Sequence, residues 1–156
     1  LSFALRHDLV WQDVPLYLLA QFVGGIGGVG AANLMFGLPA VFISNHPRAG
    51  MAQLFSEFIA TLGLVSVILA ASRSHVAVVA IGVGAYISAA YWFTASTSFA
   101  NPAVTVARSL SDTFAGIRPV DVPGFVLAQL AGGIAATVLF WWLMPAQNDN
   151  GNEQIP

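Results

Sequence analysis

The sequence predicts an all-α membrane protein whose spanning helices form a bundle with an inverted internal repeat, and three observations support this prediction. First, 57% of the 156 residues are hydrophobic and 8% are charged, whereas about a quarter of an ordinary soluble domain is charged. Second, four apolar segments approach or exceed the roughly 20 residues needed to cross the hydrocarbon core of a bilayer. Third, a 14-residue stretch near the start recurs near the end with nine identical positions.

The composition excludes several classes of function. A soluble fold needs a charged outer shell, whereas a protein solvated by lipid tails needs apolar side chains on its outside too. The arginines are scattered singly, so no basic patch is available to bind nucleic acid. Because cysteine is absent and no histidine has a second ligand at metal spacing, we expect no metal site and no cofactor. The five arginines are Arg6, Arg48, Arg73, Arg108 and Arg118.

The first spanning helix is predicted at about 14–36. No Asp, Glu, Lys or Arg occurs between Asp13 and Arg48. Asp13 is expected to cap the amino end of this helix, and Pro15 is tolerated in the first turn, where backbone donors are unsatisfied in any case.

The remaining spans are separated by polar loops rich in helix breakers. They are predicted at about 51–71, 76–93 and 122–144. The sequence QNDNGNEQIP after Ala146 is polar, so we expect a membrane domain over 1–145 and a disordered tail over 146–156.

A short helix is predicted between the third and last spans, in the segment TASTSFANPAVTVARSL. The segment is too short and too polar to cross the bilayer. Asn101 is a good N-cap, Pro102 suits the first helical position, and the helix is expected to continue to about Leu110. We therefore predict a half-helix that enters the membrane and returns to the same side.

The repeat then has opposite orientations in its two copies. DVPLYLLAQFVGGI begins at Asp13 and DVPGFVLAQLAGGI begins at Asp121. Two spans separate the copies, so a re-entrant segment between the last two spans forces the repeated helices to run in opposite directions. Inverted repeats with half-helices near the midplane are a transport architecture, because the amino end of a half-helix brings free N–H groups and a positive dipole end into the path.

The motifs together resemble a known family. Asn101-Pro102-Ala103 opens the half-helix, SEFIATLGL begins the second span, AIGVGAY lies in the third, and LAQxxGG lies in both repeated helices. Over 1–145 the sequence resembles the major intrinsic protein family of aquaporins and glycerol facilitators, and in particular its bacterial metalloid-permeable members. That family has six spans and two such half-helices. We therefore expect two spans and a first half-helix to be missing from this amino-terminally truncated sequence, which starts at Leu1.

The resemblance implies roles for residues around the half-helix. Asn101 matches the asparagine whose amide donates hydrogen bonds to the permeating solute; the alternative is a purely structural N-cap. The outer selectivity filter falls on Ala89, Ser98 and Val104. Water-specific members carry histidine at the first of these positions, and the last is normally arginine. The substitutions therefore imply a wider constriction with fewer strong donors.

Three polar residues at membrane depth are expected to brace the re-entrant loops. Glu57 is the only carboxylate inside a predicted span. The resemblance assigns its counterpart hydrogen bonds from the loop backbone, and direct contact with solute is the alternative. Gln21 and Gln129 are equivalent across the repeat, and each needs a partner. Small residues at helix-packing spacing are Gly24, Gly28, Gly132 and Ala136.

The expected function is a passive channel for small neutral solutes, namely glycerol-like polyols, undissociated metalloid acids such as arsenite, and water. A water-selective channel, a coupled transporter and a nonfunctional fragment are the alternatives. A coupled transporter needs titratable groups along its path, and the spans offer Glu57 alone. No nucleophile, base and orienting group share a predicted face, so no enzyme is expected. The resemblance further implies a homotetramer in the lipid bilayer of a bacterial inner membrane.

Overall fold

The computed structural model describes residues 2–5 and 10–144, and within these ranges every regular element is helical. Four of the helices are long and apolar enough to cross a membrane. This confirms the all-α fold class, while the tail predicted at 146–156 lies outside the described residues. The elements are α1 Ser2–Leu5, α2 Val14–Met35, α3 Met51–Ala71, α4 Val76–Phe93, α5 Pro102–Arg108, the 3-10 turn η1 Pro119–Asp121, and α6 Val122–Leu143.

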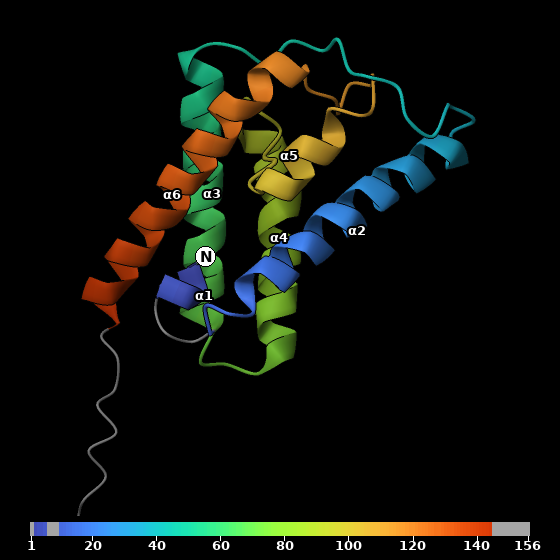
Figure 1. Cartoon of the computed structure of the whole chain (residues 1–156). Helices are drawn as coiled ribbons and strands as arrows, with labels where there is room; N and C mark the ends of the chain where they lie inside the picture. The colour runs from blue at the N-terminus through green and yellow to red at the C-terminus, as the bar shows by residue number, and fades with distance from the viewer. Residues whose placement is uncertain (1, 6–9, 145–156) are drawn as a thin grey trace, which may run out of the picture.

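The course of the chain in Figure 1 confirms the inverted repeat. In this view α2 runs upward, and α6, which carries the second copy of the repeated sequence, runs downward. Because α4 ends at the top and α6 begins there, the intervening chain enters and leaves the bundle on the same side. α5 is therefore a re-entrant half-helix.

Small residues set the close packing of α3 against α6. A Cβ atom at Gly132 would overlap the carbonyl oxygen of Phe58 and lie 3.1 Å from the backbone nitrogen of Leu62. Glycine thus lets the two backbones approach each other. Gly24 and Gly28, expected to pack in the same way, have no heavy atom within 4 Å of an added Cβ. No described residue therefore packs closely against these two glycines, and their role as helix-packing positions stays a prediction.

Helix ends differ from the predictions in two places. Asp13 is the N-cap of α2, but its side chain makes no capping hydrogen bond, because the residue itself is in the helical region at φ −86° and ψ −19°. The half-helix ends at Arg108 rather than Leu110, because the last turn tightens. The N–H of Ser109 bonds to Val106 and that of Leu110 to Ala107, each three residues back.

A small aromatic core supports the half-helix. Phe99, Ile117 and Phe125 are buried together, with the rings of Phe99 and Phe125 edge to face at a centroid distance of 5.5 Å. Phe99 lies in the loop before α5 and Phe125 in the first turns of α6. The core therefore fastens the re-entrant loop to a spanning helix.

Candidate functional site

Asn101 begins the half-helix in an orientation that leaves its amide group available. Its backbone is extended, and its side-chain oxygen accepts a 2.8 Å hydrogen bond from the N–H of Ala103. Within the described residues the side-chain NH2 group has no hydrogen-bond partner. Asn101, Pro102 and Ala103 border a cavity of about 540 Å³, whose other walls come from α1, α2, α3, α6 and the chain before α2.

The loop that leads into Asn101 is held in a strained conformation. Thr97, Ser98 and Ala100 have φ values of 61°, 49° and 51°. Residues with side chains rarely adopt this left-handed region, and each such residue costs on the order of 1–3 kcal/mol. The surrounding structure must therefore stabilise this loop.

Glu57 supplies much of that stabilisation. The carboxylate is fully buried in α3. It accepts hydrogen bonds from the backbone N–H of Phe99 at 2.8 Å and of Ala100 at 2.9 Å. The side-chain N–H of Gln129 donates a third hydrogen bond at 2.6 Å. A buried carboxylate requires such partners, and here they orient the backbone directly before Asn101.

Gln129 also connects the loop to the half-helix. Its amide nitrogen lies 2.8 Å from the hydroxyl oxygen of Thr105, which in turn donates to the carbonyl oxygen of Asn101 at 2.9 Å. Residues of α3, α5 and α6 thus share one buried network. Gln21, the counterpart of Gln129, is exposed and makes no hydrogen bond within the described residues, although it borders the same cavity as Asn101.

The three predicted filter residues do not border this cavity. Ser98 is buried, and its hydroxyl has no hydrogen-bond partner within the described residues. Val104 is half-buried on α5, and Ala89 is exposed on α4. The structure therefore brings Asn101 into a cavity while leaving the predicted filter positions outside it.

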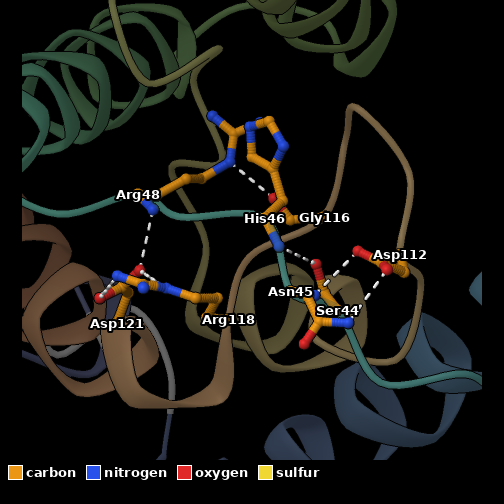
Figure 2. Close-up of polar contacts among 8 residues, drawn as sticks. All are labelled: Ser44, Asn45, His46, Arg48, Asp112, Gly116, Arg118 and Asp121. Carbon is orange, nitrogen blue, oxygen red and sulfur yellow. Dashed lines mark hydrogen bonds and ion pairs between the residues drawn. The ribbon is translucent and has the colours of Figure 1, made fainter.

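An arginine in the loop before α3 holds the loops before and after α5, and the sequence pattern did not identify it. Arg48 is buried and donates hydrogen bonds of 2.7–2.8 Å to the carbonyl oxygens of Ser96, Phe114 and Gly116. Its backbone N–H donates to Asp121, as Figure 2 shows. The one feature of the sequence that could have indicated this role of Arg48 was its charge in a chain with few charged residues.

A second loop contact lies beside it in Figure 2. Asp112 accepts hydrogen bonds from the backbone and the side chain of Asn45, at 2.8 Å and 3.2 Å. The backbone hydrogen bond from Asn45 is the largest cause that lowers the pKa of Asp112 below its ordinary value. Burial lowers the pKa of Arg48, the nearby charge of Arg108 adds to this effect, and an arginine still remains protonated.

Comparisons with known proteins agree with this architecture. The family model described as major intrinsic protein matches residues 71–155, more than half of the chain. Aquaglyceroporin AqpS of Rhizobium meliloti (strain 1021) is 53% identical over 144 residues, which cover 92% of this chain. This chain spans 62% of the length of that relative. No solved structure matches significantly. The chain belongs to the major intrinsic protein family, and it is an integral membrane protein.

Proposed function

We propose that this chain is part of a passive channel for small neutral polar solutes in a bacterial inner membrane. The observation that carries the proposal is the geometry of Asn101. Its side-chain oxygen accepts a hydrogen bond from the half-helix, its NH2 group has no partner among the described residues, and the residue borders a cavity at the re-entrant loop. An unpaired donor at membrane depth costs free energy unless water or a solute supplies the acceptor.

The geometry suggests how a solute crosses. The hydrogen bond from Ala103 fixes the asparagine side chain, so that its two remaining donors have one orientation. A hydroxyl oxygen of a polyol, or of an undissociated acid, accepts a hydrogen bond there and recovers part of the hydration that it loses. The half-helix begins at the same residue, and its positive end makes the passage of cations unfavourable.

We propose glycerol-like polyols, undissociated metalloid acids such as arsenite, and water as the solutes. Ala89, Ser98 and Val104 at the expected filter positions have small or medium side chains, which favours solutes larger than water. The relative at 53% identity is named an aquaglyceroporin. The proposal includes a homotetramer with one pore per subunit, which chemical cross-linking in membranes can test.

A coupled transporter is the less favoured candidate. Glu57, the one carboxylate in the described spans, already accepts three hydrogen bonds from Phe99, Ala100 and Gln129. A carboxylate that must bind and release a proton in each cycle would have to give up these contacts. We therefore expect solute flux to be independent of a proton gradient.

The test is solute uptake by proteoliposomes that contain the full-length protein encoded by the gene. Stopped-flow light scattering measures water, glycerol and arsenous acid permeability in the same vesicles, with empty vesicles as control. We expect all three to exceed the control. High water permeability with complete exclusion of glycerol and arsenous acid would contradict the proposed solute class.

A further inference from the structure

Two arginines lie over the ring of Phe99, and they differ in how their donors are used. The guanidinium carbon of Arg48 is 4.7 Å from the ring centroid and that of Arg108 is 4.3 Å from it. Three backbone carbonyl oxygens accept hydrogen bonds from Arg48. The guanidinium of Arg108 makes no hydrogen bond to any residue that the structure describes, and its Nη1 atom is buried without a partner. The first arginine is therefore structural, while the second has free donors.

Apart from the ring of Phe99, the charge of Arg108 has no partner among the described residues. No carboxylate in residues 2–5 and 10–144 forms an ion pair with it, and Glu57 already accepts three hydrogen bonds. Arg108 is half-buried, and burying its Nη1 donors without a partner is costly unless water or a ligand supplies acceptors. The unpaired guanidinium of Arg108 therefore indicates that a molecule with oxygen acceptors binds beside it.

A second cavity gives that molecule room. Arg108 borders a cavity of about 430 Å³ that lies between the end of α2 and the loop after α5. The polar neighbours there bond to one another: Asn33 accepts from the Ser111 hydroxyl at 2.8 Å and donates to the Ala40 carbonyl oxygen at 3.1 Å. Among the described residues that line this cavity, Arg108 is the one with a positive charge.

The half-helix brings Arg108 near the expected filter position. Val104 and Arg108 are four residues apart, and residues at this spacing lie on the same face of a helix. Side chains lean toward the amino end of their helix, so the long side chain of Arg108 extends back toward the level of Val104. The contact with Phe99, two residues before Asn101, agrees with this direction.

We propose that Arg108 is a specificity-determining residue of the channel, one turn further along the half-helix than Val104. Its donors bind the oxygen atoms of passing neutral solutes, and its charge repels cations. Val104 is small enough to leave space for this side chain. The inference rests on the proposed channel function and deepens it, since it names a residue that selects the solute.

The first test compares Arg108→Ala with the unchanged full-length protein in proteoliposomes. A five-carbon polyol and glycerol are measured separately, together with Na⁺ leak. We expect the ratio of the two polyol permeabilities to change about tenfold, the equivalent of one charged hydrogen bond, and Na⁺ leak to rise. Val106→Ala is the matched control, because Val106 lies on the opposite face of α5.

The outcomes separate the two proposals. Without glycerol flux in the unchanged protein, the channel proposal fails. If glycerol flux is present but Arg108→Ala leaves the polyol ratio and the Na⁺ leak as they were, only the role of Arg108 is overturned. Should Arg108→Ala not assemble, Arg108→Lys becomes the deciding variant. It keeps the charge and loses the planar donors, so Na⁺ exclusion should persist while the polyol ratio changes.

Thiol chemistry gives a second measurement on assembled protein. This chain contains no cysteine, so Arg108→Cys introduces the one thiol in this part of the protein. A positively charged thiol reagent should restore Na⁺ exclusion in the Arg108→Cys channel, while a negatively charged reagent of similar size should not. Equal effects of both reagents, or no effect of either, would overturn the assignment of charge selection to position 108.

Discussion

The two copies of the repeated helix, α2 and α6, share a sequence but not an environment. Gln129 in α6 is buried and hydrogen-bonded to Glu57 and Thr105, whereas Gln21 in α2 is exposed and has no partner within the described residues. Gly132 is pressed against the backbone of α3, whereas an added Cβ at Gly24 meets nothing within 4 Å. The same motif is thus a packed, bonded face in one copy and an open face in the other.

A second pair of equivalent glycines, Gly25 and Gly133, shows the opposite pattern of contacts. Gly25 of α2 lies against the half-helix, where a Cβ would be 3.4 Å from the Cβ of Ala107, while Gly133 of α6 has nothing within 4 Å. Each copy therefore shows one of its two glycine faces in contact and the other open. The motif therefore encodes two packing faces, and each face needs its own neighbour before it contributes stability.

The largest change in unfolding free energy is expected at the equivalent glycines Gly24 and Gly132. Gly132→Ala puts a methyl group into the Phe58 carbonyl, and overpacking of this kind typically costs about 1–3 kcal/mol of unfolding free energy. Gly24→Ala meets no atom and raises helix propensity by about 0.5–1 kcal/mol. Reversible unfolding in mixed detergents measures both. If Gly24→Ala and Gly132→Ala lost the same unfolding free energy, another element would have to pack against the open face of α2.

The glutamine pair is expected to give the next largest difference. Gln129→Leu removes donors from Glu57 and Thr105 inside the bundle, which should cost about 1–3 kcal/mol. Gln21→Leu breaks no hydrogen bond among residues 2–5 and 10–144, so the unfolding free energy of this variant should change little. The same detergent titration tests both variants. A large loss for Gln21→Leu would mean that this side chain has a partner comparable to Glu57.

A smaller difference is expected where the two copies start. Asp13 and Asp121 have nearly the same backbone angles, and neither caps its helix with its side chain. Asp121 nevertheless accepts hydrogen bonds from the backbone of Arg48 and from Arg118, so Asp121→Ala should cost about 1 kcal/mol. Asp13→Ala is the matched control. Faster proteolysis of the loops before α3 and α6 in the Asp121 variant alone would support this contrast, and equal rates would contradict it.

The smallest effect is expected at the reversed glycine pair. A methyl group at Gly25 would be at ordinary to tight contact distance from Ala107. In Gly25→Ala the gain in helix propensity should offset most of this crowding, so the unfolding free energy should fall only slightly. Gly133→Ala should gain about 0.5–1 kcal/mol, because nothing obstructs the methyl group. Thermal unfolding of both variants checks the sign. A loss at Gly133 larger than that at Gly25 would refute the reversal.

Most of the fold could be predicted from local pattern. The apolar length of each span, the breakers between them and Pro102 after Asn101 indicated the helices to within a few residues. The polar segment around Asn101 and the repeat together predicted the inverted topology. The end of α5 was missed because a tightened last turn depends on hydrogen bonds that residue preferences do not specify.

The candidate site was predictable in part. Glu57 and Gln129 stood out as polar residues at membrane depth, where an unpaired group is costly. The role of Arg48 and the free donors of Arg108 could not be seen, because both depend on which carbonyl oxygens lie near each guanidinium. Ser96, Phe114 and Gly116 are far from Arg48 in the sequence and come together only in the folded loops.

The sequence by itself determined the membrane environment, the helices and the opposite directions of the repeated copies, because hydrophobic length and helix breakers act locally. Only the tertiary structure decided which copy of each repeated residue is used. Gln129 is hydrogen-bonded, whereas Gln21 has no partner in the part of the chain that the structure describes, although their local sequences are alike. Hydrogen bonds and close packing require a second element within a few ångströms, and a repeated motif specifies the face it offers but not the neighbour that meets it.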